Sequence, residues 1–570
     1  MNKTTLFTTT FSIVMALTVP AMKASAQVPT SNADGLKSTI ASSAVLSSSR
    51  ALVQKLYAAR AFQPIFVMNG KLTAAASDLR NAVMAIAPTH GLHAADYWST
   101  GLEAAFTGGL DPAASANVEM QLAKIYVDLA SHISVGRLNP QSISRDIKYA
   151  KRTFDASALV SGAGAEGISA MVQRVAPQHH LYKAQLQILA RLQQIRTQGG
   201  FAALAPAKVT LKVGVTNSVV GQMKTRLKAL GYPLSNTSDV YDQELLNVIR
   251  DVQINNLADV KSESELSGQV SPGSSTTWGY FAVPLDRRIQ DVELNLEKLR
   301  WLPQNLEARH IFVNLATSHM YLHDPNLSSS FDMLRDQKIA NGRPARKTPS
   351  MRDETKSVIL NPKWGVPTTV FREDKVPMIR DILAKGGQWA LQDWFSQKRF
   401  TVMDDNFTNY IDPMTIDWVN LNPKAVNFYI VQQPGYDNAL GVAKVMLGNP
   451  WSIYMHDTNE RATVFDQVLR EVSSGCLRML YPRDMVAYLL QGTQWDRYAI
   501  DSFVPNYTGE TRDAETLVQI PPQNKLPLYT MHLTGNLGDD GVIRFTRDLY
   551  SQNSDIASAL KEAGFNRTPQ

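Results

Sequence analysis

The sequence predicts an α+β multidomain protein, with helices in the first half of the chain and strands in the second. Three observations predict this class. The chain has 570 residues, which is too long for one hydrophobic core. Apolar residues recur at helical spacing across residues 51–196, as in Leu122, Ile125 and Leu129. Later in the chain, short β-branched runs such as residues 357–360 are bounded by Asn, Pro and Gly, which favours strands.

Residues 1–26 have the pattern of a secretory signal. Lys3 supplies the charged start, an apolar stretch covers residues 11–19, and Ala24-Ser25-Ala26 is a small-residue cleavage site. The apolar stretch is shorter than the roughly 20 residues needed to span a bilayer. We therefore expect the remaining chain to lie outside the cytoplasm, either cleaved free or held by an uncleaved anchor.

The elements that follow predict two helical units. A helical scaffold domain is expected over residues 27–205, and a helix within residues 283–305, ended by a proline, should complete it. Between them, residues 210–280 form a small unit with two expected helices, 219–230 and 242–253. The chain thus predicts an interrupted scaffold with a small helical domain inserted in it.

The strand-rich domain is expected over residues 308–555, with an interruption at residues 372–426. This interruption is helix-like and aromatic; its aromatic residues are Trp389, Trp394, Phe395, Phe400, Phe407, Tyr410 and Trp418. Such an insertion is either a mobile lid or an additional packed layer, and composition favours neither.

Composition excludes some classes of function. The net charge of +6 is spread along the chain and does not form the basic runs of a nucleic-acid arm, so we expect no nucleic-acid partner. Cys476 is the only cysteine, so no intramolecular disulfide can form. By itself this thiol is either an inert or intermolecular cysteine, or a nucleophile.

The chemistry-bearing residues lie close together in the sequence, from Tyr454 to Arg478. A nucleophilic cysteine needs a nearby imidazole, which His456 can supply to Cys476. Gly475 permits close approach of a carbonyl, and the amides of Gly475 and Cys476 are expected to form an oxyanion hole. Arg478 should share a strand face with Cys476 and bind a substrate carboxylate. A structural histidine remains the alternative interpretation of His456.

Two further residues are expected to line the pocket. Tyr454 should share a strand face with His456, and Trp364 follows a predicted strand; core packing is the alternative for both. Neither His179-His180 nor the pair His319 and His323 has a spacing that supports metal binding, so we expect no metal and no cofactor. A Ser-His-Asp hydrolase is disfavoured because no Gly-x-Ser-x-Gly pentapeptide occurs.

The His456-Asp457-Thr458 segment, followed by Ser-Ser-Gly-Cys-x-Arg at 473–478, resembles the catalytic signature of the L,D-transpeptidase family. More specifically, it resembles the large scaffold-bearing branch of Gram-negative envelopes, in which serine, here Ser474, precedes the glycine. Three other segments carry the same resemblance: 295–303, 361–367 and 433–441. Residues 210–280 are similar to a peptidoglycan-binding domain, but depart from its usual Asp-Gly-x-x-Gly-x-x-Thr at 267–273.

The resemblance, which covers about residues 51–560, implies a function. Cys476 would be the nucleophile and His456 the base of an L,D-transpeptidase that forms 3–3 peptidoglycan crosslinks from tetrapeptide donor stems. Ser474 would lie at the substrate site, and residues 372–426 would cap the substrate. Implied partners are donor and acceptor peptide stems and other cell-wall synthesis proteins. The implied location is the periplasm, the implied role is cell-wall biogenesis and cell shape, and carbapenems would be inhibitors.

Several alternatives stay open within and beyond this family. The same acyl-enzyme chemistry serves lipoprotein anchoring, D-amino-acid exchange, 1–3 crosslinking or hydrolysis. A catalytically silent wall-binding scaffold that uses residues 210–280 is an alternative from another class, although the intact Cys476 and His456 pair argues against it. The sequence carries no signal for an oligomeric state.

Overall fold

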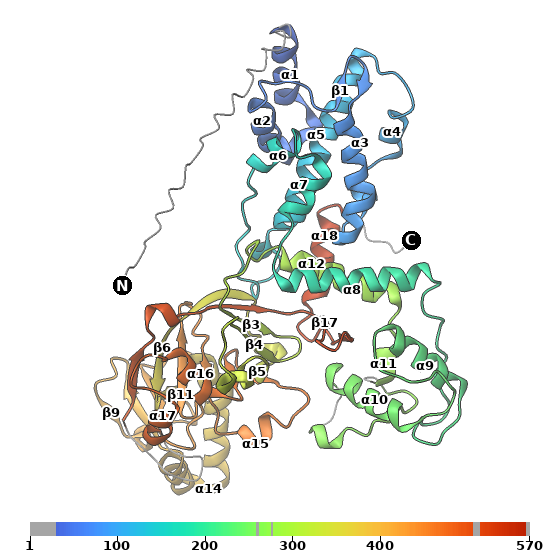
Figure 1. Ribbon diagram of the computed structural model, residues 1–570. Coiled ribbons are helices and arrows are strands. Elements are labelled where there is room, and N and C mark those ends of the chain that lie inside the picture. Colours follow the sequence, from blue (N-terminus) through green and yellow to red (C-terminus); the bar gives the residue numbers. More distant parts are fainter. Residues whose placement is uncertain (1–29, 258–261, 275–276, 505–513, 566–570) are drawn as a thin grey trace, which may run out of the picture.

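The computed structural model describes residues 30–257, 262–274, 277–504 and 514–565, and Figure 1 shows the arrangement of the units. The predicted signal, residues 1–26, lies outside the described residues. Among the helices that are described, none has the length and apolar character to cross a membrane.

The scaffold is a helical bundle organised around the long helix α5. Asp111 caps the start of α5 by accepting from the Ala114 amide, Pro112 occupies its first turn, and the helix ends at Gly136. One side of α5 buries Leu122, Ile125 and Leu129, as their spacing predicts. The helices are α1 (Thr30–Ser42), α2 (Arg50–Ala58), α3 (Ala74–Asn81), α4 (Thr100–Ala104), α5 (Pro112–Val135), α6 (Ser157–Gly162) and α7 (Ile168–Val175), and the short strands are β1 (Val67–Met68) and β2 (Lys71–Leu72).

Two packed helices, α8 (His180–Thr197) and α12 (Leu285–Leu299), lie between the bundle and the strand-rich domain (Figure 1). The end of α12 buries a charged cluster. The Glu297 carboxylate accepts from Arg137 Nε at 3.1 Å and from Arg300 Nη1 at 3.3 Å, and all three side chains are shielded from solvent. Buried charges are tolerated only when they are paired in this way. The cluster therefore joins α12 to the chain that leaves α5.

The small unit contains α9 (Ser218–Ala229), α10 (Gln243–Asn255) and α11 (Thr277–Ala282). Its first two helices follow the predicted ranges, because Asn217 and Asp242 cap their starts by accepting backbone amides. Isolated bridges Leu211↔Val270 and Thr216↔Val240 complete the unit.

The catalytic domain is a sheet that closes on itself. The strand order is β11-β12-β14-β5-β4-β3-β16-β6-β15, β13 pairs with β5, and an additional pairing of β11 with β6 closes the ring. The strands are β3 (His310–Asn314), β4 (His319–His323), β5 (Gln337–Gly342), β6 (Met351–Leu360), β11 (Ala443–Leu447), β12 (Met455–His456), β13 (Glu471–Ser473), β14 (Leu477–Met479), β15 (Thr516–Gln519) and β16 (Pro527–Met531). The helices α15 (Arg461–Val464), α16 (Pro482–Leu489) and α17 (Arg497–Phe503) accompany them.

Strand β3 is buried on both faces because it belongs to two cores. Ile311 and Val313 point into the core of the catalytic domain, whereas Phe312 packs into the core of the scaffold. Alternate residues of a strand face opposite ways, so one strand serves both units. The catalytic domain is thereby packed directly on the scaffold.

The C-terminal segment differs from the predicted domain boundary. The sequence placed residues up to 555 in the catalytic domain, but β17 (Gly535–Leu537), β18 (Ile543–Phe545) and α18 (Gln552–Glu562) pack against α8, α10 and α12. Ile556 and Leu560 of α18 belong to the same core as the scaffold helices. The physical reason is that the apolar face of α18 meets α12, which sequence spacing alone does not reveal.

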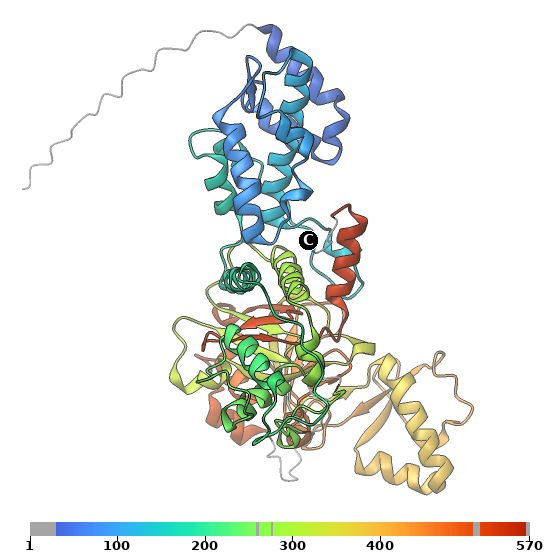
Figure 2. The same cartoon turned by 90° about the vertical axis from the view of Figure 1, so that its right-hand side faces the viewer.

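The insertion folds as a unit with its own core and projects from the catalytic domain (Figure 2). It contains α13 (Thr368–Val370), α14 (Val376–Gln397) and the four-stranded sheet β7-β10-β8-β9. These strands are β7 (Trp364–Gly365), β8 (Phe400–Asp404), β9 (Tyr410–Ile411) and β10 (Phe428–Gln432). The unit therefore extends beyond the expected residues 372–426, because β7 and β10 pair with each other and contribute to the same core.

A scaffold segment also reaches the catalytic domain beside β6. The Lys148 amide donates to the Ser350 carbonyl at 2.8 Å, and the Ser350 amide donates to the Asp146 carbonyl at 2.9 Å. The Tyr149 hydroxyl donates to the Met351 carbonyl at 2.8 Å. These bonds hold Arg145 and Asp146 at the edge of the cavity described next.

Candidate active site

Three neighbouring strands carry the candidate residues on one face. Strand β12 is parallel to β14, with His456 level with Arg478, and antiparallel to β11, with His456 level with Lys444. Because side chains alternate along a strand, Tyr454 lies on the same side as His456, and Cys476 on the same side as Arg478. The register thus gathers these side chains on a single sheet face.

Cys476 lies at the end of the turn between β13 and β14, and hydrogen bonds fix the conformation of this turn. The Ser473 hydroxyl donates to the Cys476 carbonyl at 2.7 Å and accepts from the Gly475 amide at 3.1 Å. The Gly475 carbonyl accepts from the Thr348 hydroxyl at 2.8 Å. Gly475 has a φ of 116°, and a side chain there would also meet Ile453 at 3.1 Å. This backbone conformation explains why the residue before Cys476 is glycine.

The expected oxyanion hole is therefore corrected in part. The sequence assigned the amides of both Gly475 and Cys476 to it, but the Gly475 amide is already bonded to Ser473. A donor committed to another acceptor cannot stabilise a developing charge. Gly475 thus acts through its conformation, and the signal that could have revealed this is Ser473, whose hydroxyl lies two residues away.

His456 is buried and held in one tautomer. Its Nδ1 donates to the Asp457 carbonyl at 2.5 Å, so the proton lies on Nδ1 and Nε2 keeps its lone pair. Burial lowers the pKa of His456 to about 3, and the positive charge of Arg478 contributes to this effect. The Asp457 carboxylate instead pairs with Arg461 at 2.8 Å and accepts the Val442 amide at 3.0 Å. The backbone of Asp457, not its side chain, therefore orients the imidazole.

The thiol is half-buried and protonated in this state. Burial raises the pKa of Cys476, and hydrogen bonds with Tyr454 together with the charge of Lys444 oppose that effect. The thiol contacts the Ser452 carbonyl at 3.5 Å. Because the thiol is protonated at neutral pH, nucleophilic chemistry here requires a base.

Lys444 is a residue that the sequence analysis did not identify. Its Nζ lies 3.8 Å from the centre of the Tyr454 ring. Burial lowers the pKa of Lys444. The pairing of β11 with β12, the next strand along the chain, brings it here.

The remaining predicted residues lie around a cavity of about 1150 Å³. Tyr454, His456, Ser474, Cys476, Arg478 and Trp364 all contribute to its lining. Arg478 is paired with the exposed Glu460 at 2.7 Å, so a substrate carboxylate would have to share or replace that partner. The Trp364 ring packs on Phe400, and Lys375 Nζ lies 5.3 Å from the centre of the Trp364 ring. Trp364 therefore belongs to the insertion's side of the cavity.

Arg346 connects the insertion to the turn that carries the thiol. Its Nη1 donates to Asp374 at 2.7 Å and to the Ser474 hydroxyl at 2.9 Å, and Nη2 donates to Glu373 at 2.5 Å. The Arg346 side chain is only 8% exposed, whereas its partner Glu373 is largely open to solvent. Ser474 is thus linked to the insertion, a contact that sequence spacing could not reveal. We call this set of bonds the Arg346 latch.

The fold brings three chemical groups of the site together. A thiol, a neutral imidazole with a lone pair on Nε2, and a tyrosine hydroxyl share one face at the base of a large cavity. Cysteine-dependent acyl transfer uses groups of these kinds.

Two parts of the chain match known protein families. Residues 51–189 match the family of scaffold domains, and residues 308–496 match the L,D-transpeptidase catalytic domain. The chain is 28% identical over 267 residues to a Haemophilus influenzae protein named "Putative L,D-transpeptidase"; this alignment covers 47% of the chain and 49% of that relative. The match thus spans about half the length of each protein. Residues 308–496 are therefore similar to the L,D-transpeptidase catalytic domain.

Proposed function

We propose that this protein is an exported L,D-transpeptidase that forms 3–3 crosslinks in periplasmic peptidoglycan by acyl transfer through Cys476. The observation that carries the proposal is the common sheet face of Cys476, His456 and Tyr454 at the base of the cavity. The predicted signal at residues 1–26 supports export, and the family supports peptidoglycan stems as the substrate.

In the acylation step, the Cys476 proton moves to Nε2 of His456 and the thiolate attacks the carbonyl of the diaminopimelate residue in a tetrapeptide donor. The oxyanion is stabilised by the Tyr454 hydroxyl and the Cys476 amide. The bond to D-Ala then breaks, and its nitrogen takes the proton from His456. This leaves a thioester on Cys476.

In the transfer step, an amine of the acceptor stem attacks the thioester and loses a proton to His456. The new amide forms as the Cys476 sulfur leaves and takes that proton back. Water competes with the amine for the thioester, so exclusion of water favours transfer over hydrolysis. The insertion, joined to the site by the Arg346 latch, is suited to this task.

The charge of the cavity supports an anionic peptide substrate. Among the described residues that line it, seven are cationic and four are acidic; the cationic ones are Arg145, Arg343, Arg346, Lys347, Lys375, Lys398 and Arg478. Peptide stems carry several carboxylates, which such a lining attracts.

The test has two parts. Purified mature protein incubated with disaccharide tetrapeptides should give 3–3 dimers and free D-Ala, and His456→Ala should lose nearly all turnover while His319→Ala retains it. Intact-mass spectrometry should show one covalent carbapenem adduct in the wild type and none in Cys476→Ala. Tripeptide products without dimers would indicate hydrolysis instead, and an adduct that survives Cys476→Ala would refute the mechanism.

A further inference from the structure

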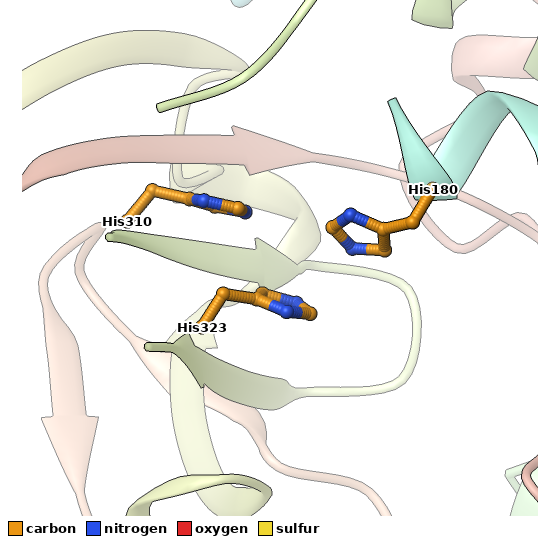
Figure 3. A group of neighbouring side chains, drawn as sticks. All are labelled: His180, His310 and His323. Carbon is orange, nitrogen blue, oxygen red and sulfur yellow. The ribbon is translucent and has the colours of Figure 1, made fainter. Parts of the chain in front are cut away.

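Three histidines that are far apart in the sequence converge where the scaffold meets the catalytic domain (Figure 3). His180 is the first residue of α8, His310 begins β3 and His323 ends β4. His310 and His323 are directly paired across the two strands. The three histidines are far apart in the chain, so their spacing in the sequence gives no sign of this group.

The spacing of the rings is close to that of metal ligands. Ring centres are 4.6 Å apart for His310 and His323, 4.1 Å for His180 and His323, and 5.7 Å for His180 and His310. One nitrogen from each ring lies within 4.8 Å of the other two. Tetrahedral ligation at about 2.0–2.1 Å places nitrogens roughly 3.3 Å apart, so small rotations of the side chains suffice.

His310 has a nitrogen that needs a partner. Its Nδ1 donates to the Glu307 carbonyl at 2.6 Å, which places the lone pair on Nε2. That Nε2 is buried without a hydrogen-bond partner, and the residue is 3% exposed. Metal-binding histidines commonly donate one ring N–H to a carbonyl and ligate through the other nitrogen. His310 therefore already has the arrangement of a ligand.

The other conditions for metal binding are also met. Histidine binds a metal ion as the neutral imidazole, and its ordinary pKa of about 6.5 makes that form the major one at pH 7. His180 is exposed at the start of a helix, which leaves a path for an ion. The positive end of α8 disfavours a cation, so the affinity for an ion must come from the three imidazoles.

We propose that His180, His310 and His323 bind a divalent transition-metal ion, Zn²⁺ being the expected one, with a fourth position for water. Imidazole nitrogens suit zinc, copper and nickel rather than magnesium or calcium. None of the three histidines lines the catalytic cavity, so the site is separate from Cys476. The ion would connect the scaffold helix α8 to the β3–β4 hairpin of the catalytic domain.

The experiment uses the tag-free mature chain carrying Cys476→Ala, which prevents metal binding by the active-site thiol. After removal of metal with a chelator, calorimetric titration with Zn²⁺ should give one site per chain. Titration with Co²⁺ should give the intense visible bands of a four-coordinate ion, and Zn²⁺ should abolish them. Zn²⁺ should also raise the melting temperature of this protein.

Variants locate the site. His180→Ala and His323→Gln should each weaken Zn²⁺ binding at least about 100-fold and remove the visible bands of Co²⁺. Loss of a residue that only hydrogen-bonds to a metal ligand lowers metal affinity about 10- to 100-fold, and loss of the ligand itself should lower it more. His319→Ala is the matched control, since it lies at the other end of β4 and pairs with Asp336 at 2.6 Å. Circular dichroism should confirm that each variant is folded. Should His310→Ala fail to fold, the conclusion rests on the other two.

Two outcomes would overturn the proposal. One is a folded Cys476→Ala protein with no Zn²⁺ binding at millimolar concentration. The other is binding of equal stoichiometry and affinity in folded His180→Ala and His323→Gln. Neither outcome bears on acyl transfer, so failure here is distinguishable from failure of the proposed function.

Discussion

Replacement of Glu297 by Gln should destabilise the region where α12 meets the scaffold. Gln keeps the shape of the side chain but removes the charge between Arg137 and Arg300, which are fully buried. Burial alone would raise the pKa of Glu297, yet the two arginines hold it at about 2 instead of 4.5. At about 1.4 kcal/mol per pKa unit, that difference corresponds to roughly 3 kcal/mol of stability at neutral pH. Removal of one member of a buried ion pair usually costs a similar amount, about 3–5 kcal/mol.

The assay is thermal unfolding of the full chain followed by circular dichroism. For a cooperative unit of about 150–250 residues, a loss of roughly 3 kcal/mol lowers the melting temperature by about 6–12 °C. The matched control is Asp286→Asn on the same helix, whose pair with Arg196 at 3.9 Å is exposed and should contribute under about 1 kcal/mol. Because folding lowers the pKa of Glu297, its contribution should be complete above about pH 4.5 and decline as the pH falls towards about 2. Equal melting temperatures for the Glu297 and Asp286 variants would refute this reasoning.

Three further predictions concern the site. Arg346→Ala should break the Arg346 latch and raise the ratio of hydrolysis to transfer. The control is Arg372→Ala, because Arg372 bonds to Pro423 of the insertion, and this variant should keep the wild-type ratio. Equal product ratios in the two variants would show that the latch has no effect on transfer. Alkylation of Cys476 by iodoacetamide should rise about tenfold per pH unit from pH 6 to 8. The alkylation rate should not reach a plateau in this range, because burial raises the pKa of the Cys476 thiol and His456 is neutral. A plateau would indicate a preformed thiolate–imidazolium pair. Tyr454→Phe should slow carbapenem acylation roughly 100-fold without loss of folding, and wild-type rates would exclude its hydroxyl as an oxyanion donor.

Much of the fold could be predicted because its signals are local. Capping residues and apolar spacing place α9, α10 and α12 close to their observed bounds. The common face of Tyr454 and His456, and of Cys476 and Arg478, follows from the alternation of side chains along a strand.

The rest depends on strand pairing, on the fold of one turn and on a contact between distant segments. Lys444 reaches the site because β11 pairs with β12, and Arg346 because the turn after β5 lies beside the insertion. The commitment of the Gly475 amide to Ser473 depends on the fold of one turn. None of these has a periodic signal in the sequence, which explains why the cysteine and histidine could be identified and their neighbours could not.

The packing of α18 has a consequence for how the chain matures. Ile556 and Leu560, near the end of the chain, share a core with helices that are synthesised first. The core that α18 shares with α12 therefore cannot be complete until residues 556–560 have been synthesised. Contacts of such large sequence separation slow folding, since a long loop must close before they form.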